Sequence, residues 1–445
     1  MDNAMDHDRL HGILTELTAR HRVPGAQLAV FHEGARFLVH TGVADTASGA
    51  PVGPDTAFPV GSLTKPFTAA LAMILVADGD VDLDEPLIDQ LPEFGAGALV
   101  TLRQLLSHTA GLPSDVAEGT AEAGGDRAGW VARHCRRTDL THPPGTVFSY
   151  SNVGYVVVGR LIEAVTGMTW QEAIGAVLLE PLGLRPAFVA GPERTGRPVA
   201  AGHAVQAARG RIVPVPEQDL PEVEMPNGAL ALSAGDLLAF AGLYFAGCPD
   251  PEPLDRATAD DMCFDQLASM AVGPYGMADG WGLGWARFDD GAEDVYGHNG
   301  TGDGTSCHLR FDPVNGSAVA LTTNANTGQA LWDDLVPRLR ELGLAVGDRP
   351  DPEPPAGAAA PPPPDGCLGR YTNGDTTFEV LRGDGDGLLL SFGGAPHSEL
   401  LCTPDLRFVM RELGSGARSP GRFVPDPATG RIDYLQITGR LAPRA

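Results

Sequence analysis

Ser62 and Lys65 are the first pair of residues in this sequence that could do chemistry together. The 445-residue chain has 31 lysines and arginines, and Lys65 is its only lysine. Arginine keeps its proton in a protein, whereas a lysine whose pKa is lowered by burial or by nearby positive charge can accept one. The three-residue spacing of Ser62 and Lys65 puts both side chains on one face of a helix, one turn apart. The pair therefore predicts a serine nucleophile with an amine beside it as its base.

A tyrosine and an asparagine form the second candidate group, in the segment Tyr150-Ser151-Asn152, ahead of a helix predicted from about Tyr155. A phenol near a serine and a lysine can carry a proton between the nucleophile and the leaving group. An amide two residues later can hold the amide of an acyl group. By itself, a Tyr-x-Asn triplet is common in loops.

The third candidate group is His298-Asn299-Gly300-Thr301, followed by a predicted strand over residues 306–311. The imidazole of His298 could polarise the tyrosine or bind substrate. Because Gly300 has no side chain, an extended substrate could lie against the strand. A backbone N–H near Thr301 could join that of Ser62 in an oxyanion hole.

Together, in this order, the three groups resemble the Ser-x-x-Lys, Tyr-x-Asn and Lys/His-x-Gly motifs of the serine β-lactamase and penicillin-binding-protein superfamily. The resemblance includes the flanking segments 58–65, 101–112 and 144–152, and it covers roughly residues 8–345. It is strongest for the class C-like branch, in whose esterases, D-amino-acid peptidases and peptide cyclases histidine replaces the third-motif lysine. The resemblance implies an acyl-enzyme intermediate and requires neither a cofactor nor a metal ion.

The resemblance also implies a role for each motif residue. Ser62 is the nucleophile, and Lys65 and Tyr150 form its base and acid. Asn152 binds the substrate amide, and His298 supports the tyrosine. The family fold is an antiparallel sheet flanked by helices, with an all-helical subdomain and the site in the cleft between them. Two departures qualify the comparison: no lysine in the third motif can recognise a carboxylate, and no glutamate is positioned as a deacylation base. Rapid hydrolysis of a β-lactam is therefore not predicted.

The apolar pattern predicts the elements that must position these residues. Helices are predicted over residues 8–21, 66–78, 101–107, 155–166, 170–179 and 234–245, and strands over 27–32, 36–40 and 318–323. This indicates a mixed α/β (α+β) body with strands at both ends and helices between them. The tail has strand patterns at 378–381, 388–392, 406–410, 422–424 and 433–438, with a glycine-rich hairpin at 383–387. We expect the tail to be a small, barrel-like antiparallel β unit.

The clearest boundary is the proline-rich segment 348–366, which favours an extended spacer over helix or sheet. The sequence therefore predicts a catalytic domain over residues 1–347, a linker over 348–366 and a lipocalin-like β domain over 367–445.

Charge and composition exclude several classes of protein. The net charge of -26 would repel a nucleic acid. The acidic N-terminus lacks the pattern of a secretion signal, and no apolar run is long enough to span a membrane, so we expect a cytoplasmic protein. The six cysteines show no metal-ligand spacing and are expected to be reduced thiols. The absence of a Gly-x-Ser-x-Gly elbow argues against an α/β-hydrolase.

A structural role is the preferred interpretation of several other conspicuous residues. His108, in a Ser-His-Thr triplet, is expected to stabilise a turn. Cys307 and His308 resemble a thiol and its base, but neighbours in a strand point to opposite faces. The pairs His7/His11 and Asp384/Asp386 have spacings that a metal ion could use, but we expect them to be solvated surface residues. The tryptophans Trp281 and Trp285 are expected in the core or the cleft wall.

The leading functional hypothesis is a cytoplasmic peptide cyclase, similar to the penicillin-binding-protein-type thioesterases that carry a lipocalin-like C-terminal domain. Ser62 would take a peptidyl group with a D-residue at its C-terminal end from a carrier-protein thioester, and the peptide's own amine would release it as a macrolactam. The alternatives are a D-stereospecific peptidase, a D,D-carboxypeptidase-like hydrolase or esterase and, in another class, an inactive binding protein. Arg440, near the C-terminus, could bind the carboxylate or carbonyl of the incoming residue, or could be a surface arginine.

Overall fold

The computed structural model describes residues 5–116, 126–191, 197–206, 209–215, 217–218, 220–245, 253–289, 294–348, 363–383, 387–414, 416–426 and 428–445. The chain groups into two compact units. The first comprises Met1–Asp82, Val158–Phe264 and Gly282–Asp348, and the second comprises Leu83–Val157, Asp265–Trp281 and Arg349–Ala445. Most of the predicted linker, residues 349–362, lies outside the described residues, so the proposed division at 348–366 stays a prediction.

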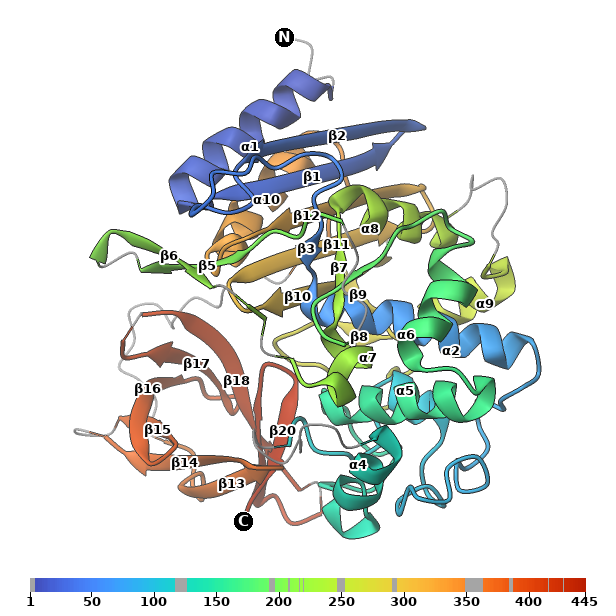
Figure 1. Cartoon of the computed structure of the whole chain (residues 1–445). Helices are drawn as coiled ribbons and strands as arrows, with labels where there is room; N and C mark the ends of the chain where they lie inside the picture. The colour runs from blue at the N-terminus through green and yellow to red at the C-terminus, as the bar shows by residue number, and fades with distance from the viewer. Residues whose placement is uncertain are drawn as a thin grey trace. The chain divides into compact units, whose positions relative to one another are not determined.

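An antiparallel sheet forms the centre of the first unit, with the strand order β2-β1-β12-β11-β10-β9 (Figure 1). Ala29 of β1 pairs with Ala320 of β12, so strands from the two ends of the predicted body meet in one sheet. This confirms the mixed fold expected from the sequence. The strands are β1 (Gly25–His32), β2 (Ala35–Gly42), β9 (Ala286–Asp289), β10 (Asp294–Gly302), β11 (Thr305–Asp312) and β12 (Ser317–Thr323).

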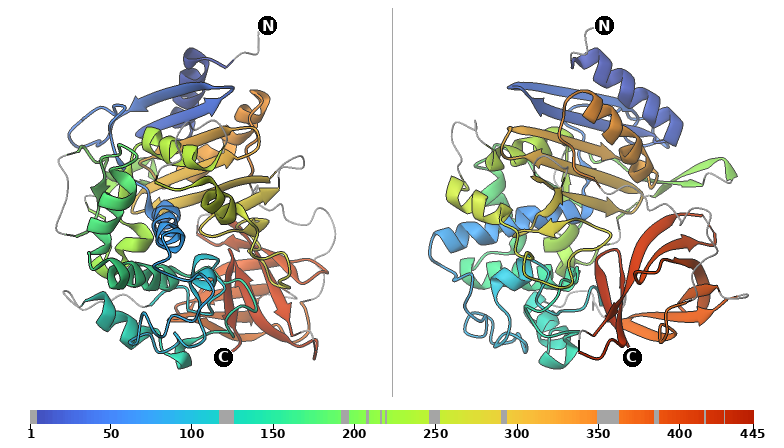
Figure 2. Two further views of the ribbon diagram at one scale, coloured as in Figure 1. Left: turned by 90° about the vertical axis from the view of Figure 1, so that its right-hand side faces the viewer. Right: turned by 180° about the vertical axis from the view of Figure 1, so that it is seen from behind.

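Two helices from opposite ends of the first unit's sequence, α1 (His7–His21) and α10 (Gly328–Glu341), cover one face of the sheet and lie side by side in Figure 2. Leu28 of β1 and Leu321 of β12 pack with the apolar residues of both helices. Because side chains alternate along a strand, His298 and Gly300 of β10 point to the other face, and Asn299 points toward α10.

The other face carries α8 (Ala234–Ala241) and the turn that leads into α2 (Thr64–Ala77). Helix α2 is buried from Thr64 to Leu75, which explains why it is apolar on every side. It starts two residues before the predicted helix and ends at Ala77, with Asp78 as its C-cap, ahead of Gly79, whose φ of 81° suits a glycine.

Short elements complete the first unit. The helix predicted over 170–179 begins as α6 (Trp170–Ala173) and continues as a π-helical segment, η3 (Ile174–Leu179). Helix α5 (Asn152–Thr166) contains the boundary between the units. The other short elements are β3 (Phe58–Pro59), η1 (Gly61–Leu63), β4 (Ala187–Phe188), β5 (Gly202–Gln206), β6 (Arg211–Val215), η5 (Glu222–Glu224), α7 (Met225–Gly228), β7 (Leu230–Leu232), η6 (Gly242–Tyr244) and α9 (Arg256–Cys263).

The tail of the second unit is an eight-stranded antiparallel sheet in sequence order. Tyr371 bridges Arg444, and the N–H of Ala445 donates to the carbonyl of Arg370 at 3.0 Å, so the sheet curls into a nearly closed barrel, as the sequence predicted. Its strands are β13 (Gly369–Asn373), β14 (Thr376–Arg382), β15 (Leu388–Phe392), β16 (Ala395–Cys402), β17 (Arg407–Glu412), β18 (Arg418–Pro425), β19 (Ile432–Ile437) and β20 (Arg440–Pro443).

The rest of the second unit is mainly short helices and turns. Its elements are α3 (Leu102–Leu106), α4 (Arg127–His134), η2 (Arg137–Asp139) and β8 (Gly280–Trp281). A capping box between Thr101 and Gln104 starts α3, in the segment predicted as a helix. Trp281 and, in the first unit, Trp285 are both buried, as expected for core residues. Within the described residues, no helix is long and apolar enough to cross a bilayer.

Candidate active site

Ser62 and Lys65 face each other at the start of α2. The Nζ of Lys65 donates to the Oγ of Ser62 at 3.0 Å and to the carbonyl of Asn227 at 3.0 Å, and the lysine is 0% exposed. Ser62 lies in the 3₁₀ turn η1, and α2 begins at Thr64, so the pair spans a helix junction. The two side chains face each other, as their spacing in the sequence predicted. The Asn227 carbonyl has no signal in the sequence, because it reaches the amine from the short helix α7, far along the chain.

Neighbouring backbone fixes the turn that carries Ser62. The N–H of Val60 donates to the carbonyl of Leu230 at 3.0 Å, and the N–H of Leu230 donates to Oγ1 of Thr64 at 3.1 Å. From β11, the hydroxyl of Thr305 donates to the carbonyl of Pro59 at 2.9 Å. Because these bonds reach residues on both sides of Ser62, they hold the nucleophile turn against β7 and β11.

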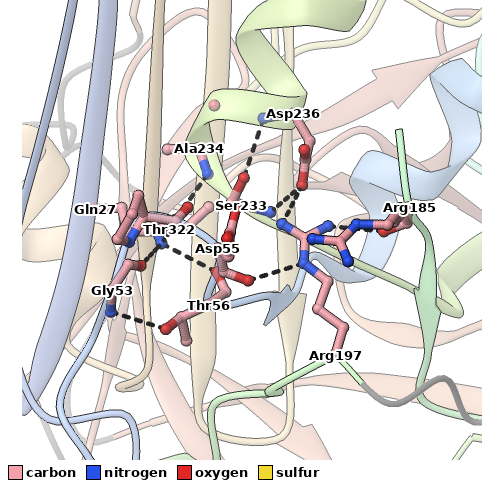
Figure 3. Close-up of polar contacts among 12 residues, drawn as sticks. Gln27, Gly53, Asp55, Thr56, Arg185, Arg197, Ser233, Ala234, Asp236 and Thr322 are labelled. Atoms are coloured by element: carbon pink, nitrogen blue, oxygen red, sulfur yellow. Dashed lines mark hydrogen bonds and ion pairs between the residues drawn. The ribbon is translucent and has the colours of Figure 1, made fainter. Parts of the chain in front are cut away.

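A polar network holds the chain just before this turn (Figure 3). The side chain of Gln27 donates to the carbonyl of Thr56 at 3.0 Å. The largely buried Arg197 donates to the carbonyl of Asp55 at 2.8 Å and pairs with the carboxylate of Asp236 at 2.6 Å. Both side chains bind backbone carbonyls of one segment, so they fix the path of the chain into β3 and the nucleophile turn.

Two glycines allow β10 to lie directly against the nucleophile turn. A Cβ at Gly300 would overlap the carbonyl oxygen of Val60, and a Cβ at Gly61, whose φ is 50°, would overlap the carbonyl oxygen of Thr301. The backbone of Thr301 therefore lies beside the residue that precedes Ser62. This close approach is what the oxyanion arrangement expected from the sequence requires.

His298 is a neutral hydrogen-bond acceptor in this arrangement. The residue is 3% exposed, and its Nδ1 lies 2.6 Å from the carbonyl oxygen of Asn299. A carbonyl only accepts, so Nδ1 carries the proton and Nε2 carries the lone pair. Burial and the charge of Lys65 lower the pKa of His298 to about 3. At neutral pH the ring cannot act as an acid, but it can accept a hydrogen bond from a hydroxyl, which suits the supporting role implied by the family.

A buried network behind His298 was not expected from the sequence. Arg310, 1% exposed, donates to Oδ1 of Asn299 at 2.8 Å, and Nδ1 of His308 shares that oxygen at 3.0 Å. The guanidinium also pairs with Asp348 at 3.5 Å and lies 5.2 Å from the ring centre of Trp332. The network fixes Asn299, the residue between His298 and Gly300. The available signal was an arginine between Leu309 and Phe311 in the strand predicted over residues 306–311. His308 is part of this support, on the face opposite Cys307.

Tyr150 is held by backbone and side-chain contacts in the second unit. Its N–H donates to the carbonyl of Gly439 at 3.1 Å, and its carbonyl accepts from the hydroxyl of Ser114 at 3.0 Å. His108 accepts from the N–H of Ser151 at 3.1 Å, and its ring centre lies 4.3 Å from that of Tyr150. His108 thus contacts the tyrosine segment as a structural group.

Asn152, the first residue of α5, presents its amide in one orientation. Its Nδ2 donates to the carboxylate of Asp115 at 2.6 Å. An ionised carboxylate only accepts, so the NH₂ group must face Asp115 and Oδ1 must face away from it. Oδ1 is buried and has no hydrogen-bond partner among the described residues. It can accept an amide N–H, which fits substrate binding. Asp115 is a second functional candidate with no signal in the sequence.

Arg440 lies beside this segment. Its guanidinium carbon is 5.0 Å from the ring centre of Tyr150, and among the described residues the side chain has no carboxylate partner. Arg440 starts β20, directly after a tight turn in which Thr438 and Gly439 have φ values of 45° and 72°.

The predicted site residues thus form two groups, each within one unit. Ser62, Lys65, His298, Gly300 and Thr301 belong to the first unit, and Tyr150, Asn152 and Arg440 belong to the second.

The sequence also contained residue pairs with spacings that a metal ion could use. In the part of the chain that the structure describes, no group of three or more histidine, cysteine, aspartate or glutamate side chains could hold a metal ion. His7 and His11 are exposed on α1, and Asp384 and Asp386 lie outside the described residues.

Comparisons with known proteins agree with the motifs. The family model described as Beta-lactamase matches residues 10–343. Penicillin-binding protein 4 of Amycolatopsis lactamdurans is 34% identical over 356 residues, which are 78% of this chain and 91% of that protein. The crystal structure of SurE has a TM-score of 0.87 and 39% identity over 99% of both chains, and SurE with D-Leu has a TM-score of 0.84 and 38% identity over the same shares. The D-amino acid amidase of Ochrobactrum anthropi SV3 has a TM-score of 0.62 and 25% identity over 76% of this chain and 98% of that one. This chain therefore belongs to the β-lactamase and penicillin-binding-protein superfamily of serine hydrolases and acyltransferases.

Proposed function

We propose that the protein is a serine acyltransferase that releases a peptide from a carrier-protein thioester as a head-to-tail macrolactam. The observation that carries the proposal is the buried Lys65 amine, 3.0 Å from the Oγ of Ser62. In its neutral form this amine accepts the serine proton while Oγ attacks the thioester carbonyl. The C–S bond breaks, the thiol leaves with a proton, and the peptidyl group stays on Ser62 as an ester.

The second half of the reaction regenerates the serine. The free amine of the same peptide attacks the ester carbonyl, a C–N bond forms, and the C–O bond to Ser62 breaks. The amine loses one proton, and Oγ regains one. The resemblance assigns the transfer of protons to and from the leaving groups to Lys65 and Tyr150. The neutral His298 fits this scheme as a hydrogen-bond acceptor, since its ring carries no proton that it could donate from Nε2.

A D-residue at the C-terminal end of the peptide belongs to the same proposal. Asn152 offers a buried amide oxygen that can accept the N–H of this residue, and Asp115 keeps the oxygen in that orientation. The similarity to SurE, solved with D-Leu, and to a D-amino acid amidase supports the stereochemical preference.

Arg440 is proposed to bind the carbonyl or carboxylate of the incoming residue. Its guanidinium has no carboxylate partner among the described residues and lies beside the ring of Tyr150. The Arg440→Ala variant should keep the acylation rate of Ser62 and lose selectivity among amine nucleophiles. Unchanged selectivity in a competition between added amines would remove this role.

Incubation with a linear peptidyl thioester mimic, analysed by mass spectrometry, tests the function. The substrate carries a D-residue at its acyl end, the L-epimer is the matched control, and Ser62→Ala is the inactive control. The dehydrated ring from the D-substrate supports the cyclase. Free acid alone refutes it and favours a D-peptidase or esterase, which the similarity to Esterase EstB of Burkholderia gladioli also supports. No adduct at Ser62 with a slow acylating ester would indicate an inactive binding protein.

A further inference from the structure

Two hairpin tips of the C-terminal barrel bind the segment that carries Tyr150 and Asn152. The first tip begins at Asn373, the last residue of β13, and the second joins β19 to β20 at Gly439. Both tips belong to the same compact unit as the tyrosine segment. More than two hundred residues of sequence separate the tips from that segment.

Asn373 satisfies polar groups on both sides of its amide. It is 3% exposed, its Oδ1 accepts from the N–H of Ser114 at 2.7 Å, and its Nδ2 donates to the carbonyl of Leu441 at 2.8 Å. The N–H of Leu441 donates in turn to the hydroxyl oxygen of Ser149 at 3.1 Å. The amide accepts on one side and donates on the other, whereas an ionised carboxylate of the same size could only accept and would lose the bond to Leu441.

Ser114 extends the contact to the backbone of both second-motif residues. Its carbonyl accepts from the N–H of Asn152 at 2.8 Å, and its hydroxyl donates to the carbonyl of Tyr150 at 3.0 Å. The next residue, Asp115, orients the amide of Asn152. One backbone turn therefore connects the barrel tip with the two residues of the second motif.

Gly439 makes the second contact without an intermediary. Its carbonyl accepts from the N–H of Tyr150 at 3.1 Å, and its own N–H donates to the carbonyl of Tyr275 at 3.0 Å. Its φ is 72°, and any Cβ would overlap the side chain of Met277. An alanine here would strain the left-handed backbone and displace the side chain of Met277.

We infer that Asn373 and Gly439 are positioning residues for the acyl-transfer reaction, and that the barrel is part of the device that holds Tyr150 and Asn152 in place. The inference rests on the proposed function, because that function gives these two residues their roles. Displacing a reacting group by about 1 Å costs on the order of 100-fold in rate, so backbone contacts of this kind are large enough to control activity.

The test uses the full-length variants Asn373→Asp and Gly439→Ala with an ester substrate. Asn373→Asp keeps the size and the acceptor but loses the donor to Leu441, and we expect kcat to fall about 10- to 100-fold in a folded protein. The matched control for the second variant is Gly430→Ala: Gly430 lies in the β18–β19 turn with a φ of 69° and nothing within 4 Å of its Cβ. The control should stay within about twofold of the parent.

A double-mutant cycle separates positioning from a merely structural role. In the Tyr150→Phe, Asn152→Ala background, adding Asn373→Asp should lower the remaining rate less than about twofold, because the groups that it positions are gone. A loss of the same size in both backgrounds would refute the inference. So would parental kcat values in both single variants, provided that the parent acylates Ser62. No acylation of the parent enzyme by a slow ester would overturn the proposed function itself, and the inference with it.

Discussion

Replacing Lys65 by methionine should separate activity from stability. Methionine keeps most of the length of the side chain and removes the amine that donates to Ser62 and Asn227. Loss of a general base costs about 100- to 10,000-fold, which corresponds to roughly 3–5.5 kcal/mol in the barrier to acylation. We expect the rate of Ser62 acylation by a slow ester to fall by at least 100-fold.

The free energy of unfolding should change much less than the barrier. The substitution leaves the carbonyl of Asn227 without this donor, which costs about 1–3 kcal/mol. It also removes an amine that is 0% exposed in the folded protein, and taking such a polar group out of water is itself unfavourable. The two effects oppose each other, so the net change should lie within about 2 kcal/mol. Urea unfolding measures it.

The Lys65→Arg variant tests the role of proton acceptance with the charge retained. A guanidinium remains protonated, so the rate of acylation should fall. It is also larger than the ammonium group that it replaces at a fully buried position, so the free energy of unfolding should fall by about 1–3 kcal/mol. The control is Arg431→Met, at a side chain that is 73% exposed. Intact-protein mass spectrometry follows the acyl adduct over time. Acylation of Lys65→Met within tenfold of the parent would refute the assignment of Lys65 as the base.

Three further predictions concern the parts around this pair. Asp115→Asn removes the constraint on the amide of Asn152 and should raise KM for a peptidyl substrate about tenfold with a smaller change in kcat; an unchanged KM would exclude the orienting role. Gly300→Ala forces β10 away from the nucleophile turn and should cost at least about 100-fold in kcat, whereas Gly242→Ala, with nothing within 4 Å of its Cβ, serves as control. The pKa of His298 is about 3 in the folded protein and about 6.5 in the unfolded chain, so the unfolded state binds more protons and stability is lost as pH falls from about 6.5 toward 3, by up to about 1.4 kcal/mol per pH unit. Urea unfolding at pH 7 and pH 5 should show a smaller pH dependence in His298→Gln, and an unchanged one would contradict it.

The features that the sequence predicted depend on local patterns. Helical periodicity predicts that Ser62 and Lys65 share one face, and they do so although Ser62 lies in a 3₁₀ turn. The barrel-like tail follows from alternating strands and glycine turns, and the mixed body follows from strands at both of its ends. Each helix, strand or turn in these predictions can be recognised from only a few neighbouring residues.

The features that the sequence did not predict depend on contacts between distant segments. The carbonyl of Asn227 belongs to the short helix α7, which carries no motif, yet it lies 3.0 Å from the amine of Lys65. Asp115 carries no family signature, and only the fold shows that it orients Asn152. Asn373 is one polar residue at a hairpin tip among many turn residues. A side chain that binds distant backbone leaves no periodicity, so such groups become visible only with the tertiary structure.

The pairing of β1 with β12 has a consequence for how the protein is made. At about 5–20 residues per second, the ribosome delivers the partner of Ala29, which is Ala320, roughly 15–60 s after β1 itself. During this interval β2 can cover one edge of β1, and the other edge exposes its N–H and C=O groups. A nascent chain that stops before β12 therefore carries an open strand edge, and its fate should depend on chaperones and proteases in the cell.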